Sequence, residues 1–124
     1  MNGSRLRKLG QALTAISAGV IAYATLAPNI SAGDTNATLA HFLLFLPLGA
    51  GSALWMALLP AAAQKRVGVI LLAIILIFAA ATELAQGPIE GRTPSLNDWF
   101  ADAAGGALGI LLGRLVASRI VRQR

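Results

Sequence analysis

The chain has 124 residues, of which 56% are hydrophobic and only 12% are charged. Soluble domains carry about 25% charged residues, so this composition excludes an ordinary water-soluble fold. The absence of cysteine and the single histidine exclude disulfides, thiol catalysis and zinc sites built mainly from cysteine or histidine.

Long uncharged runs predict the first two membrane spans. Residues 9–33 and 35–64 contain no charged side chain, and each run can hold the roughly 20 residues that cross a bilayer. We predict spans at about 11–29 and about 39–59. The basic start of the first span also resembles a signal peptide, but Pro28 directly after Ala27 disfavours cleavage there, so we expect an uncleaved span.

The last two predicted spans must include acidic residues. The uncharged runs 67–82 and 103–113 are too short alone, so a third span at about 67–86 has to contain Glu83. A fourth at about 98–117 has to contain Asp98 and Asp102 at one end and Arg114 at the other. The sequence therefore predicts one all-α domain, 1–124, an integral membrane bundle of four transmembrane helices in antiparallel up-down order.

The distribution of basic residues predicts the orientation. Nine of the ten lysines and arginines fall before the first span, in the 60–66 loop or from Arg114 to the end, which share one side in a four-span bundle. Lys and Arg accumulate in short cytoplasmic loops, so we expect both termini in the cytoplasm and a location in the inner membrane. Topology explains the net charge of +5, and no nucleic-acid partner is expected.

Small residues recur every four positions on the fourth span, at Ala101, Gly105, Gly109 and Gly113. This spacing forms one helix face and lets a neighbouring helix approach closely. Asp98 and Asp102 continue the same row, so their carboxylates should point into the bundle. We expect Gly49 and Gly51 of the second span to receive this face, which also offers a contact for a homodimer.

Six polar residues at the outer ends of the spans form the candidate site: His41, Glu83, Gln86, Arg92, Asp98 and Asp102. Glu83 and Gln86 are three residues apart and share a helix face. They either sit hydrated among lipid headgroups or line a wet cleft, because ionisable groups inside a span are costly and tend to mark sites.

The other candidates each have a structural interpretation beside the functional one. His41 can be a hydrogen-bonded packing group, and Arg92 a solvated loop charge or a clamp for phosphate or carboxylate. Asp98 fits the acid position of a capping box that begins at Ser95. Asp102, one turn deeper, has no capping role.

The order of these residues resembles that of a known family. His41 is followed by E-x-x-Q at Glu83–Gln86, by Arg92 in a short loop, and by D-x-x-x-D-x-x-G from Asp98 to Gly105. Over roughly residues 41–113 this pattern is similar to the VanZ-like family of small bacterial membrane proteins. That family commonly has asparagine at the position of Asp102. The resemblance implies a multi-span envelope protein, whose namesake is associated with low-level teicoplanin resistance, and it implies neither settled chemistry nor resistance for this chain.

The leading functional hypothesis is a cleft at the extracytoplasmic leaflet that binds a lipid-linked or headgroup-bearing envelope component. Arg92 would meet phosphate or carboxylate, while Glu83 and Asp102 would orient Arg92 or accept hydrogen bonds. The expected partners are membrane lipids and a lipid-linked envelope precursor, with no cofactor and no metal. Three alternatives stay open: a hydrolase or transferase acting on a phospho-lipid or acyl bond with His41 or Glu83 as base, a proton or cation transporter, and a structural membrane subunit.

Overall fold

The computed structural model describes residues 2–27 and 34–122, without the side chains of residues 34 and 35. This part of the chain forms four helices and no strand: α1 (Gly3–Leu26), α2 (Asp34–Met56), α3 (Ala61–Gln86) and α4 (Leu96–Arg122). Each helix is long and apolar enough to cross a membrane. The predicted all-α bundle with four spans is confirmed. The expectation that the first span is not cleaved concerns the segment after Ala27, and residues 28–33 lie outside the described residues.

All four helices extend beyond the predicted spans at one end, and α2 begins at Asp34, before the predicted start near residue 39. α1 begins at Gly3, α3 begins at Ala61 and α4 continues to Arg122, so the helices include basic residues that the spans left out. Lysine and arginine are good helix formers, and a charge therefore limits the apolar span without ending the helix. At the start of α1, the side chain of Asn2 accepts a hydrogen bond of 2.9 Å from the backbone N–H of Arg5.

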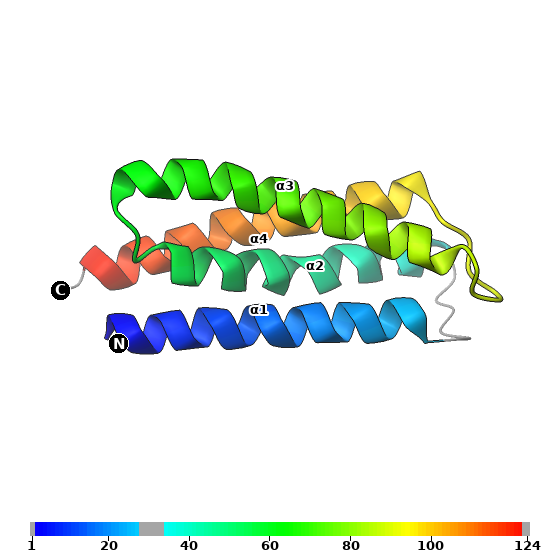
Figure 1. Ribbon diagram of the computed structural model, residues 1–124, viewed down its shortest axis with the longest axis horizontal. Helices are drawn as coiled ribbons and strands as arrows, with labels where there is room; N and C mark the ends of the chain where they lie inside the picture. Colours follow the sequence, from blue (N-terminus) through cyan, green and yellow to red (C-terminus); the bar gives the residue numbers. More distant parts are fainter. Residues whose placement is uncertain (1, 28–33, 123–124) are drawn as a thin grey trace.

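The helices run side by side in an up-down arrangement (Figure 1). The chain enters and leaves at the same end of the bundle, which also carries the connection from α2 to α3. The loop between α3 and α4 lies at the opposite end, which we call the outer end in line with the charge-based prediction. That prediction of orientation stays a prediction.

The contact between α2 and α4 depends on the row of small residues. Gly105, Gly109 and Gly113 are buried, and a Cβ atom added at any of them would collide with a backbone carbonyl of α2. Gly49 lies in the same interface, against the backbone of Gly106 and Ile110. The predicted packing face is thus present, but it is filled within one chain, so a homodimer through this face would have to displace α2.

Gly51 does not take part in this contact, contrary to the expectation from sequence. It faces α1, where an added Cβ would lie 2.8 Å from the backbone nitrogen of Thr14 and 3.0 Å from the carbonyl oxygen of Gly10. Gly49 and Gly51 are two residues apart and therefore point about 200° apart around the helix. α2 uses one glycine toward each neighbour, which places it in the centre of the bundle.

Substituting Gly109 with alanine should destabilise the bundle by about 1–3 kcal/mol, because the new methyl group meets the carbonyl of Leu46. Gly19→Ala on α1 is the matched control, since no atom lies within 4 Å of its added Cβ. That variant should be neutral or more stable by up to about 1 kcal/mol. Unfolding in detergent micelles measures both, and equal stabilities would contradict the packing described above.

The larger apolar core joins all four helices from just below the outer end into the inner half of the bundle. Its buried members are Ile21, Phe45, Leu48, Ala53, Ile75, Ala79 and Ile110. Phe45 is 1% exposed and its ring centroid lies 5.9 Å from that of Phe78. Large apolar side chains such as Ile16 and Ile77 point outward, as expected for lipid-facing surfaces. The outer part of this core packs directly beneath the polar residues of the outer end.

Candidate functional site

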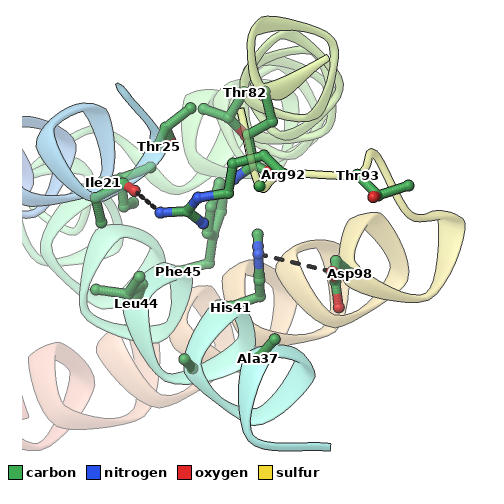
Figure 2. A pocket seen from close by; sticks show the side chains of 14 residues that line it. Ile21, Thr25, Ala37, His41, Leu44, Phe45, Thr82, Arg92, Thr93 and Asp98 are labelled. Atoms are coloured by element: carbon green, nitrogen blue, oxygen red, sulfur yellow. Dashed lines mark hydrogen bonds and ion pairs between the residues drawn. The ribbon is translucent and has the colours of Figure 1, made fainter. Parts of the chain in front are cut away.

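His41 is the centre of a polar cluster contributed by three helices. Its Nδ1 atom lies 2.9 Å from Oδ1 of Asp102 and 3.6 Å from Oε1 of Glu83. Its Nε2 atom lies 3.9 Å from Oδ2 of Asp98, the pair joined by the dashed line in Figure 2. One imidazole ring from α2 therefore meets one carboxylate from α3 and two from α4, so four of the six candidate residues come together.

The cluster is enclosed by the bundle. Asp102 is 0% exposed and Glu83 is 6% exposed, so Glu83 is not a hydrated headgroup residue. Within the described part of the chain, Oε1 of Glu83 and Oδ2 of Asp102 are buried and accept no hydrogen bond. Most buried polar atoms have a partner, because leaving one without costs free energy. These two oxygens are therefore available to a further group.

Glu83 replaces the acid that the sequence assigned to the capping box. Ser95 precedes α4, and its Oγ atom accepts a long hydrogen bond of 3.4 Å from the N–H of Asp98, as a cap residue does. The N–H of Ser95, however, donates to Oε2 of Glu83 at 2.8 Å. Half of the predicted capping box is present, and the other half comes from α3.

The carboxylate of Asp98 instead bonds to a side chain of α2. Its Oδ1 atom accepts a hydrogen bond of 2.8 Å from Oγ1 of Thr38. Sequence analysis missed Thr38, although it precedes His41 by three residues and so shares its helix face. Two successive turns of α2 thus hold the first turn of α4.

Contrary to the expectation from sequence, Arg92 does not contact the acidic cluster. Gly91 has a φ of 79°, which favours glycine, and the next side chain reaches back to α1. Nη2 of Arg92 donates to the carbonyls of Ala24 at 2.8 Å and Ala27 at 3.4 Å, at the end of α1 where a cation is favourable. It forms no ion pair with the carboxylates that the structure describes, and its Nε atom is buried without a partner among the described residues.

A pocket of about 220 Å³ separates Arg92 from His41 at the outer end (Figure 2). Asp98 lies on its wall, as does Gln86, which is 4% exposed. Phe45 closes the apolar side. The pocket therefore contains a guanidinium without a described acidic partner on one side and an imidazole on the other.

An apolar groove of about 390 Å³ lies beside the cluster, between α3 and α4. Leu84, Leu96 and Trp99 line it, and Glu83 lies at its edge. The indole Nε1 of Trp99 donates to the carbonyl of Leu76 at 3.2 Å, which holds the ring between the two helices. Glu83 therefore borders both the polar cluster and a surface suited to hydrocarbon.

Two kinds of chemistry fit the cluster. A proton on Nδ1 of His41 donated to Asp102 leaves Nε2 as an acceptor, the arrangement of a histidine that works as a general base. Alternatively, one ligand atom each from His41, Glu83 and Asp102 lies within 4.8 Å of the others, close enough to hold a single metal ion.

Comparison with known proteins supports the resemblance seen in the sequence. The model of one family, described as VanZ/LLP1, matches residues 6–117, which include every candidate residue. No curated protein and no solved structure matches the chain.

Proposed function

The chain belongs to the VanZ/LLP1 family, and we propose that its outer pocket binds the phosphate-bearing headgroup of a membrane lipid or lipid-linked envelope component. The observation that carries this proposal is Arg92, whose charge faces the pocket and meets no carboxylate among the described side chains. A guanidinium binds phosphate through two parallel hydrogen bonds, and such bonds are stronger away from bulk water.

The volume of the pocket favours a small headgroup. At about 220 Å³ it holds roughly seven times the 30 Å³ that a water molecule occupies in the liquid. It is smaller than the roughly 300–1,000 Å³ of sites that enclose a whole drug-sized ligand. A phosphate with a short polar substituent therefore fits, and the rest of the ligand would have to lie outside.

The surroundings favour a lipid over a soluble anion. Leu84 and Leu96 are 75% and 76% exposed beside the apolar groove, so hydrocarbon can contact them at the level of the polar cluster. A molecule with a phosphate at one end and acyl or prenyl chains at the other can contact both the pocket beside Arg92 and the apolar groove. A free phosphate can contact only the pocket.

Arg92→Ala should weaken binding of short-chain phosphatidic acid by about tenfold or more, because a hydrogen bond to a charged group contributes about 1.5–3 kcal/mol. Native mass spectrometry of the protein in neutral detergent can measure this, with diacylglycerol as the phosphate-free ligand. Arg66→Ala is the control, since Arg66 is exposed near the start of α3, away from the loop that follows α3. Equal affinities of both variants and the unmodified protein would refute the proposal. Thermal unfolding separates loss of binding from loss of the contact with α1.

A hydrolase acting at the same pocket is the second candidate, and the 2.9 Å contact between His41 and Asp102 favours it. Nε2 of His41 would take a proton from water while the water oxygen bonds to phosphorus or to a carbonyl carbon. The bond from that atom to the ester oxygen then breaks, and the departing alcohol oxygen takes the proton back from Nε2. Arg92 would stabilise the negative charge that develops on the oxygens of the attacked group. Binding is then the first step of the reaction.

A further inference from the structure

We propose that His41, Glu83 and Asp102 form a binding site for one divalent transition-metal ion. One imidazole nitrogen and one oxygen of each carboxylate lie within 4.8 Å of one another. The three residues come from α2, α3 and α4, so the ion would join three helices at the outer end. The site does not depend on the proposed lipid ligand.

The distances between the donor atoms suit metal coordination. With bonds of about 2.1 Å, donors 2.9 Å apart subtend about 90° at the ion, and donors 3.6 Å apart subtend about 120°. Nδ1 of His41 makes these two distances with Asp102 and Glu83 respectively. Angles of this size occur in ordinary coordination polyhedra, so an ion can enter with little movement of the helices. It would replace the hydrogen bond between His41 and Asp102.

The charge of the cluster calls for a cation. Glu83, Asp98 and Asp102 surround one imidazole, and Arg92 makes no ion pair with any of them. A protonated histidine would offset one negative charge, whereas a divalent ion would offset two. Buried carboxylates without compensating charge are strongly unfavourable.

An unpartnered oxygen provides independent support. Oε1 of Glu83 is buried and accepts no hydrogen bond from the described residues, although its side chain is more than nine-tenths enclosed. Oε1 points toward Nδ1 of His41 at 3.6 Å. Metal ligands are commonly oriented by a further hydrogen bond, and the N–H of Ser95 supplies one to the other oxygen of Glu83.

The donor set selects the class of ion. One imidazole nitrogen and two carboxylate oxygens suit Mn²⁺, Fe²⁺ or Zn²⁺ better than Mg²⁺ or Ca²⁺, which prefer oxygen alone. Three protein ligands leave further positions on the ion open. His41 also lines the outer pocket, so these positions are close to the proposed headgroup site.

The test uses the full chain, purified with a histidine-free tag, stripped with a chelator and titrated with Mn²⁺ or Zn²⁺ alone. Elemental analysis should find one tightly held ion per chain, and the ion should raise the midpoint of thermal unfolding. Glu83→Gln and Asp102→Asn should each weaken binding at least about tenfold and reduce the thermal shift. Glu90→Gln is the matched control, an exposed glutamate of the α3–α4 loop that should bind like the unmodified chain.

Absence of a bound ion from the unmodified chain would overturn the proposal. So would equal affinities of Glu83→Gln and Glu90→Gln, which compare the same substitution at a ligand and at an exposed site. If Asp102→Asn does not fold, the comparison of Glu83→Gln with Glu90→Gln and the thermal shift of the unmodified chain still test the metal site. No lipid is present in the titration, so its failure leaves the phosphate pocket untouched, and failure of lipid binding leaves the metal site untouched.

Discussion

Replacing His41 with leucine should lower the free energy of unfolding by about 3–5 kcal/mol, the cost of removing one partner from a buried ionic contact. The imidazole contacts carboxylates of both α3 and α4 from its position on α2. Without it, Asp102 at 0% exposure keeps its charge or takes up a proton without its hydrogen-bond partner. Either change favours the unfolded state. Unfolding of the metal-free chain in mixed detergent micelles measures the loss.

A second substitution shows whether the loss comes from the unpaired carboxylate. Asp102→Leu added to His41→Leu should recover part of the stability, with a coupling energy of about 0.5–3 kcal/mol. Asn36→Leu provides the control, because Asn36 is exposed on the same helix and its substitution should change stability by less than about 0.5 kcal/mol. Strict additivity of His41→Leu and Asp102→Leu would show that the contact does not stabilise the bundle.

The architecture was predictable because it depends on one-dimensional features of the sequence. The distance between charges sets the length available to a span, and four runs gave four helices. The four-residue spacing of Gly105, Gly109 and Gly113 gave a helix face that is indeed buried. The same reasoning placed Asp102 on that face, and it is completely enclosed. Helix periodicity thus predicted which side of α4 faces inward.

The pairing of that face needed three-dimensional information. Gly49 and Gly51 both looked suitable as receivers, but the rotation of α2 about its axis assigns one to α4 and the other to α1. Relative rotation depends on the packing of many side chains at once, and no local pattern encodes it. The role of Glu83 as an acceptor for Ser95 also depends on tertiary packing, because it requires the end of α3 to lie close to the start of α4.

Arg92 shows why loop residues are hard to place. Sequence reasoning set it beside the carboxylates because opposite charges at one level should attract. The loop instead turns at Gly91 and directs the guanidinium to the free carbonyls that end α1. The first span had been assigned no part in the site, yet its last turn fixes the arginine. Four of the six predicted residues lie together around His41, while the contacts of Arg92 followed from the geometry of its loop.

The hydrolytic candidate makes the largest prediction about activity. His41→Gln should reduce turnover by about 10²–10⁴-fold, the usual contribution of a general base. Glutamine can still donate a hydrogen bond to Asp102 but cannot accept a proton from water at neutral pH. The assay follows release of inorganic phosphate from phosphatidic acid and of fatty acid from phosphatidylglycerol, with the protein in detergent micelles.

The comparison with binding separates the two candidate functions. A general base acts after the ligand has bound, so His41→Gln should lose turnover while it keeps the affinity for phosphatidic acid within a few fold. Arg92→Ala should lose affinity as well. Asn36→Gln, at an exposed position of α2, should leave both quantities unchanged. If the unmodified chain hydrolyses neither lipid, or if His41→Gln turns over at the same rate, catalysis by His41 is excluded. The pocket would then act by binding alone, with the imidazole and its carboxylates holding the three helices that form it.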